Sequence, residues 1–195
     1  MLLVLPMLLV LAALLALPAT AQPTAPFETF TLRLGGTVEA PDDRYGAVWQ
    51  PSPGVDVAAT VPFYLGLTFD AGLAFSNHRA QTETLLDFLA IHGYVGLGAG
   101  LQLPVGARLH LGAHAGVLSM DFYADEAAGA FARRESELAT GLVAGGTAPL
   151  TDRLGVYVGA RWTHVYTSTP IDLVRVHAGL TWTFVTPGWL RELLQ

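Results

Sequence analysis

The chain of 195 residues contains no cysteine and no lysine, and charged residues make up only 13% of it. The absence of cysteine excludes disulfide bonds, thiolate metal sites, cysteine nucleophiles and a lipoprotein anchor. Soluble domains usually carry about 25% charged residues, so this composition is unusually apolar. The net charge of −6 also argues against a nucleic-acid partner.

Apolar residues are abundant, at 52% of the chain, and so is glycine, with 21 copies. The first segment, MLLVLPMLLVLAALLALPATAQ, is an apolar run that ends in small residues. Pro18 and the stretch Ala19-Thr20-Ala21 suit a signal peptidase, although no basic residue precedes the run. We therefore predict a signal peptide at residues 1–21 and an exported chain that begins at Gln22. An uncleaved membrane anchor is the alternative.

After Gln22 no apolar run approaches the roughly 18 residues that a membrane helix needs. Segments of alternating apolar and polar residues follow instead, and this period of two predicts β-strands. Eight such segments are present, at residues 27–39, 54–61, 65–75, 88–103, 108–117, 137–148, 154–165 and 173–184.

The connections between these segments alternate strictly in length. Those after the second, fourth and sixth segments are short (VPFY, PVGA and PLTDR), and the others are longer and more polar. This alternation is typical of an up-and-down barrel that crosses a membrane. We predict an all-β, eight-stranded antiparallel transmembrane barrel at residues 22–184, with short periplasmic turns and longer extracellular loops. Residues 185–195 then form a short periplasmic tail.

The two faces of the predicted strands differ in chemistry. One face is almost uniformly Leu, Val, Ala and aromatic, and the other carries Arg, His, Asp and many glycines. This contrast favours lipid outside and a polar lumen inside. Trp162, Trp182 and Phe184 lie near strand ends, where an aromatic girdle forms. A soluble, lipocalin-like barrel is the alternative, but it would bury several charges and expose most leucines.

An eight-stranded barrel is just wide enough for side chains to fill its interior. Charges in so narrow a space must be paired, because an uncompensated buried charge costs several kcal/mol. We predict an internal salt-bridge network that closes the pore; a gate whose pairs exchange partners and pass small ions is the alternative. The inward polar set is Arg33, Asp56, Asp70, His92, Arg108, His110, His114, Glu137, Arg161, Arg175 and His177.

The stretch RLHLGAHAGV raises the question of a metal site at His110 and His114. On a helix these two side chains would lie one turn apart. On a strand they share a face but stand about 13 Å apart, which is too wide for one ion. We therefore predict no metal site and no cofactor.

The glycine-rich YVGLGAG at residues 94–100 and the last strand, which ends in Trp182-Thr183-Phe184, are features of a known family. With the eight alternating segments, they resemble the small outer-membrane β-barrel superfamily of Gram-negative bacteria, of OmpA or OmpX type. The tail VTPGWLRELLQ departs from the family, whose chains usually stop at the terminal aromatic residue. The resemblance implies location in the outer membrane, contact with outer-membrane lipid and lipopolysaccharide, and insertion by the barrel-assembly machinery.

Two families of such barrels modify the acyl chains of lipid A, so the resemblance also raises a hydrolase site as an alternative. A serine within hydrogen-bond reach of a histidine, oriented by an acid, would be needed. Two weak groupings exist: Ser76, Asn77 and His78 with Glu83 and Asp87, and His164, Ser168 and Asp172. Polar residues at a strand rim explain both, so we predict no enzymatic activity.

The longest connection, MDFYADEAAGAFARRES, mixes aromatic, acidic and basic residues. Loops on a rigid scaffold are common places for partner contacts. We predict contacts to a surface partner or to lipopolysaccharide through Asp121, Phe122, Tyr123, Arg133 and Arg134.

The sequence thus predicts an outer-membrane barrel of structural or porin-like type with a polar, largely filled lumen. The alternatives are a narrow channel for small or apolar solutes, a surface adhesin, and a lipid A-modifying enzyme.

Overall fold

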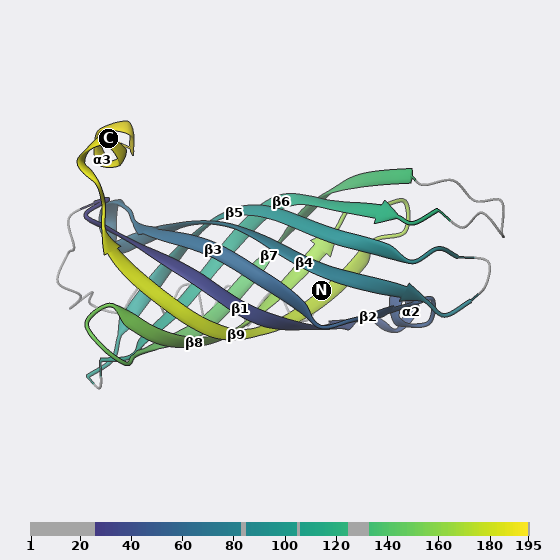
Figure 1. Cartoon of the computed structure of the whole chain (residues 1–195), viewed down its shortest axis with the longest axis horizontal. Helices are drawn as coiled ribbons and strands as arrows, with labels where there is room; N and C mark the ends of the chain where they lie inside the picture. The colour runs from purple at the N-terminus through teal and green to yellow at the C-terminus, as the bar shows by residue number, and fades with distance from the viewer. Residues whose placement is uncertain (1–25, 83–84, 105, 125–132, 195) are drawn as a thin grey trace.

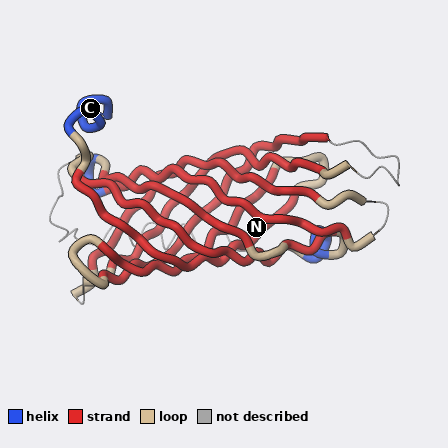
Figure 2. The backbone as a smooth tube through the Cα atoms, in the orientation of Figure 1, coloured by secondary structure: helices blue, strands red, loops and turns tan. Residues whose placement is uncertain are grey.

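The computed structural model describes residues 26–82, 85–104, 106–124 and 133–194, so the predicted signal peptide lies outside it. Eight long strands form a closed antiparallel barrel (Figures 1 and 2). They are β1 (Thr29–Pro41), β3 (Gly54–Pro62), β4 (Leu67–Ala80), β5 (Phe88–Gln102), β6 (Arg108–Phe122), β7 (Arg133–Pro149), β8 (Leu154–Val165) and β9 (Ile171–Val185). The smaller elements are α2 (Asp43–Gly46), β2 (Trp49–Pro51), the 3-10 turn η1 (Tyr64–Gly66) and α3 (Gly188–Leu194).

Each long strand pairs with its neighbours along the chain, and β1 pairs with β9 to close the barrel. The predicted all-β, eight-stranded antiparallel barrel is therefore confirmed. The strands β6 and β7 run further toward the loops than the alternation predicted. Polar contacts between the two strands stabilise this extension. The hydroxyls of Ser119 and Ser136 form a hydrogen bond of 2.9 Å, and the Arg134 guanidinium donates to the Asp121 carboxylate.

The short turns and the long loops lie at opposite ends of the barrel (Figure 1). The β3–β4, β5–β6 and β7–β8 turns share one end with α3 and the chain's C-terminal region. The α2 and β2 insertion and the described parts of the other long connections occupy the other end. We call these the short-turn end and the loop end.

The outer surface of the barrel is apolar. Leu34, Leu97 and Val158 are 50%, 52% and 59% exposed, whereas their polar neighbours face inward. A barrel with apolar side chains outside and charges inside suits lipid and not water. At the short-turn end Phe30 and Phe184 stack at 5.0 Å between ring centres, as an aromatic girdle would. Among the described residues, no helix has the length and hydropathy needed to cross a membrane.

The glycines of β5 make room for large side chains of β6. A Cβ atom on Gly98 would collide with the imidazole of His110, and one on Gly100 would collide with the guanidinium of Arg108. The glycine-rich stretch and the His- and Arg-bearing stretch that follows it therefore fit together across one strand pair. The close approach needs glycine because any larger residue would displace these side chains.

Candidate functional site

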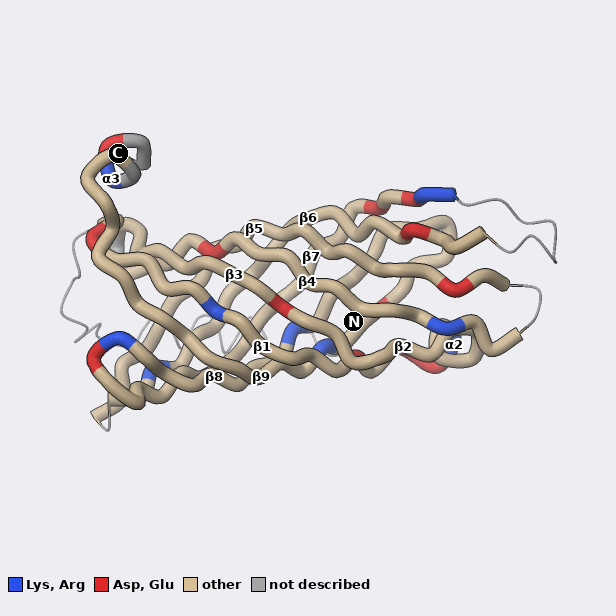
Figure 3. Tube along the Cα trace, viewed as in Figure 1, with Lys and Arg blue, Asp and Glu red and all other residues tan. Residues whose placement is uncertain are grey.

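The lumen is the candidate site, because the inward face holds the buried charged and polar side chains of the barrel. Most of the strand length carries no charge (Figure 3). Three levels differ in chemistry: an apolar cluster at the loop end, a middle layer around one ion pair, and a polar cavity at the short-turn end.

An apolar cluster fills the loop end of the lumen. Tyr45 of α2 packs there with buried side chains from the strands, and Trp49 of β2 lies against the same group. The buried members are Tyr45, Phe88, Ala90, Leu118, Met120, Phe122, Ala139, Val165 and Leu173. The prediction of a polar lumen did not include this cluster, because Leu118 and Met120 lie beyond the stretch of β6 that the alternation covered.

The helix α2 holds Tyr45 in place. Asp42 caps it, since its Oδ1 accepts a hydrogen bond of 2.8 Å from the Tyr45 amide. That hydrogen bond is the largest cause of a lowered pKa of the Asp42 carboxyl. Burial raises the pKa of the Tyr45 hydroxyl, which forms a 2.8 Å hydrogen bond with Nδ1 of His78.

A polar group lies against this cluster. Glu39 forms an ion pair with Arg175, and the Ser76 hydroxyl donates to Glu39 at 3.0 Å. His78 stacks on Phe88 with 4.6 Å between ring centres. Arg175 was predicted in the lumen, whereas Glu39 and His78 were not assigned to the network. Glu39 is the last residue of the first predicted segment and lies on its polar face, and continuing the alternation of the third segment by three residues reaches His78.

The middle layer is built on Asp56 and Arg161, which are both 1% exposed. They form an ion pair of 3.1 Å. The Arg161 guanidinium lies 3.8 Å from the centre of the Tyr94 ring, and the Tyr94 hydroxyl donates to Asp56 at 3.3 Å. Tyr94 thus holds both partners, a role that the sequence analysis did not assign. Three predicted histidines, His92, His114 and His177, are buried in the same interior.

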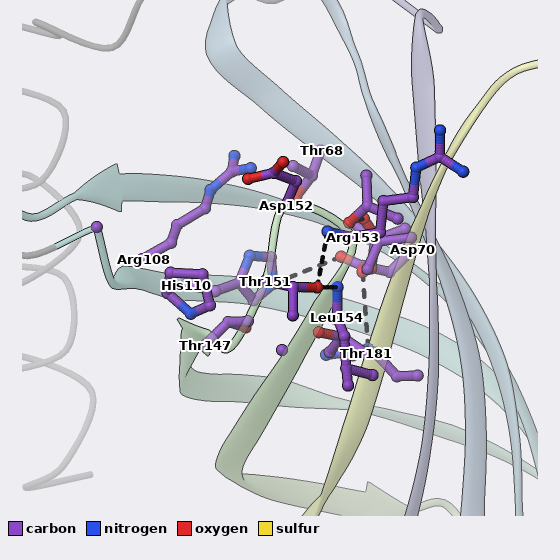
Figure 4. Close-up of a pocket in the computed structure, with 17 residues that line it drawn as sticks. Thr68, Asp70, Arg108, His110, Thr147, Thr151, Asp152, Arg153, Leu154 and Thr181 are labelled. Carbon is purple, nitrogen blue, oxygen red and sulfur yellow. Dashed lines mark hydrogen bonds and ion pairs between the residues drawn. The ribbon is translucent and has the colours of Figure 1, made fainter.

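At the short-turn end Asp70 is the centre of the polar contacts. Arg33 lies 3.7 Å and His110 lies 3.4 Å from its carboxylate, and the Thr60 hydroxyl donates to it. With Arg108 these residues line a cavity of about 220 Å³ (Figure 4). The structure therefore brings together ten of the eleven predicted lumen residues at two polar levels and beside the apolar cluster.

Glu137 is the exception. It lies opposite Leu118 near the loop end and is half-buried. Within the described chain it forms no ion pair with the predicted network. Glu137 shares the inward face of β7 with Ala139 and Gly141 but lies nearer the loop end than the charged levels, so its part in the network stays a prediction.

The predicted loop contacts divide into two groups. Tyr123, Arg133 and Arg134 have exposed side chains, and Arg134 pairs with Asp121. The Phe122 side chain instead lies inside the barrel, where it is 6% exposed and packs on Phe88 with 5.0 Å between ring centres. The prediction for Phe122 was wrong because the inward alternation of β6 continues to its last residue. Residues 125–132 of this loop lie outside the described residues.

Neither serine grouping has the geometry of an accessible hydrolase site. Ser76 Oγ and His78 Nε2 are 3.0 Å apart, but both residues are buried beneath Tyr45. Asp87 binds the Ala80 amide instead of orienting the histidine. Glu83 lies outside the described residues.

In the other grouping, His164 and Asp172 are 3.0 Å apart on the outer rim. In the part of the chain that the structure describes, no contact joins Ser168 to His164. No group of three His, Cys, Asp or Glu side chains that could hold a metal ion occurs there either.

No protein-family model matches the chain, and no curated protein matches its sequence. Among solved structures, Neisserial surface protein A is similar with a TM-score of 0.60 at 13% identity, over 80% of this chain and 97% of that one. Ail of Yersinia pestis, solved with the heparin analogue sucrose octasulfate, has a TM-score of 0.52 at 11% identity, over 80% and 98%. The N-terminal barrel of Pseudomonas aeruginosa OprF has a TM-score of 0.51 at 8% identity, over 82% and 100%. This is the fold of the small eight-stranded outer-membrane barrels.

The resemblance that the sequence suggested is confirmed at the level of the fold. Barrels of this fold span the outer membrane of Gram-negative bacteria, and the apolar outer surface fits this chain to the same place. In such barrels the short turns face the periplasm, and the same orientation would place the loop end of this chain at the exterior.

Proposed function

We propose that this protein is a structural outer-membrane barrel whose lumen is closed to solutes. The observation that carries the proposal is the apolar cluster, which fills the loop end with side chains from α2 and five strands. A hydrated ion would have to displace Tyr45, Phe88 and Phe122 together.

A second barrier supports the same proposal. The Asp56–Arg161 pair lies across the middle of the lumen, and the Tyr94 ring packs against the guanidinium. Separating the pair would leave an uncompensated buried charge, which costs several kcal/mol. The narrow channel kept as an alternative needs both barriers to move at once.

Conductance in planar bilayers tests the proposal. We expect the wild-type protein to be silent under conditions in which a general porin gives clear steps. The Tyr45→Ala/Phe88→Ala variant and the Arg161→Ala variant should each stay silent, because one barrier remains in each. The triple variant, checked for barrel formation by its mobility before and after boiling, should conduct. Steady openings of the wild-type protein would contradict the proposal.

The loop end is proposed as the place of contact with lipopolysaccharide. Arg134 and Asp121 pair on the outer rim through a 2.8 Å hydrogen bond, with Tyr123 exposed beside them. Arg133 lies 3.4 Å from Glu135. Arg133 and Arg134 stay exposed beside these carboxylates and would meet the phosphates of lipopolysaccharide.

We further propose that the barrel has no lipid-modifying activity. The support is the burial of Ser76 and His78, which leaves no room for a lipid acyl chain beside them. Lipid A acylation that changes on deletion or overexpression of the protein would contradict this.

A further inference from the structure

The cavity at the short-turn end, which we call the vestibule, holds more hydrogen-bond donors than the protein uses. Seven of the residues around it are threonines. In Figure 4, Arg108 and His110 project into this space from one side, and Asp70 lies toward the other. Residues of the short turns line the vestibule, and Asp56 and Arg161 are not among its lining residues.

The carboxylate inside the vestibule already has partners. The Asp70 carboxylate already interacts with Thr60, Arg33 and His110. At the rim, Asp152 and Arg153 are both exposed and offset each other in charge. Inside the rim, two guanidinium groups therefore face one carboxylate.

Arg108 carries the surplus positive charge. Its side chain is half-buried and lies against the backbone of Gly100. Among the described residues, its guanidinium forms no hydrogen bond and no ion pair. Two further buried donors of the same cavity, Nε of Arg33 and Oγ1 of Thr68, also lack a hydrogen-bond partner in the described chain. Polar and charged groups withdrawn from water without partners are costly, so the site favours an acceptor-rich anion.

We propose that the vestibule binds a small oxyanion of the phosphate class from the periplasmic side, with Arg108 as its main charged partner. A guanidinium donates two parallel hydrogen bonds to such an anion, and the threonine hydroxyls supply further donors. The volume of about 220 Å³ admits a phosphate ion with several waters, or one small phosphorylated metabolite. Binding here does not require the lumen above to open, so it is independent of the proposed closure.

Titration of the ¹⁵N-labelled full-length barrel in detergent micelles with inorganic phosphate tests the site, at an ionic strength held constant with chloride. We expect saturable shifts of the amides at residues 106–110 and 151–155, and none at the loop end. The Arg108→Gln variant should weaken binding about tenfold, because it removes a charged hydrogen-bond partner. The matched control, Arg134→Gln at the other end, should bind as the wild type does.

Two further probes separate the possible sources of the anion. If glucose 6-phosphate binds more tightly than phosphate, the ligand is a phosphorylated metabolite. If glucose 6-phosphate does not bind, the ligand is the free ion. Linear shifts without saturation, unchanged binding by a folded Arg108→Gln variant, or equal binding of uncharged glucose would each overturn the proposal.

Discussion

Arg161 shows how one buried side chain depends on its partners. It is 1% exposed, pairs with Asp56, and packs over the Tyr94 ring. Removing a single member of such a pair leaves the other charge without compensation, whereas replacing both removes the problem. The free energy of unfolding should therefore depend strongly on which residues are changed together.

A double-mutant cycle tests this dependence. Arg161→Met should lower the free energy of unfolding by about 3–5 kcal/mol, because Asp56 is left as an unpaired buried carboxylate. Adding Asp56→Asn should recover a large share of that loss. Guanidinium unfolding in lipid vesicles, followed by tryptophan fluorescence, measures both. The Asp56→Asn single variant completes the cycle, and a loss in the double variant equal to the sum of the two single-variant losses would show that the pair is not coupled.

At the scale of elements, the α2 insertion was beyond the reach of sequence analysis. The strands could be predicted because residues that face lipid are apolar and many that face the lumen are polar. The sequence of each strand therefore alternates with a period of two. The helix has only four residues, Asp43–Gly46, and no periodicity to reveal it. The inward position of Tyr45 depends on contacts with His78 and Phe88 that only the closed barrel creates. The Glu39–Arg175 pair depends likewise on the closure of β1 against β9.

The cap of α2 gives an element-scale prediction. Asp42→Ala should lower the hydrogen-exchange protection of the Tyr45 amide about fivefold, because an N-cap contributes about 1 kcal/mol. Asp43→Ala, which removes a first-turn acid without a cap hydrogen bond, is the matched control. Equal protection in the two variants would show that the cap does not hold α2.

The pH dependence of the cap follows from the lowered pKa of Asp42. Its folded-state pKa lies below the ordinary value of 3.8, so the stabilisation is fully present above that value. It is lost as the pH falls through the lower folded-state pKa. Protection of the Tyr45 amide should follow this course in the wild type and be insensitive to pH in the same range in Asp42→Ala, after correction for intrinsic exchange.

At the scale of the whole molecule, apolar and charged residues lie on different faces of the barrel. Leucine and valine face lipid, and the charges lie inside in pairs or at the two ends. The closed antiparallel sheet satisfies the backbone within the bilayer, which is why strands with so few charges are stable there. On the proposed function, the apolar cluster at the loop end fills the lumen in place of a pore.

The most direct test of this arrangement is the accessibility of single cysteines, since the natural chain has none. Leu97→Cys, His92→Cys and Thr151→Cys place a thiol on the outer face, in the lumen and on an exposed short turn. After reconstitution in lipid vesicles, a water-soluble maleimide should label only the cysteine at position 151. In a second experiment a fluorophore is attached to each cysteine before reconstitution, and nitroxide-labelled lipids should quench only the one at position 97. Rapid aqueous labelling at position 97 would mean that the face assigned to lipid is wet, and rapid labelling at position 92 would mean that the lumen is open.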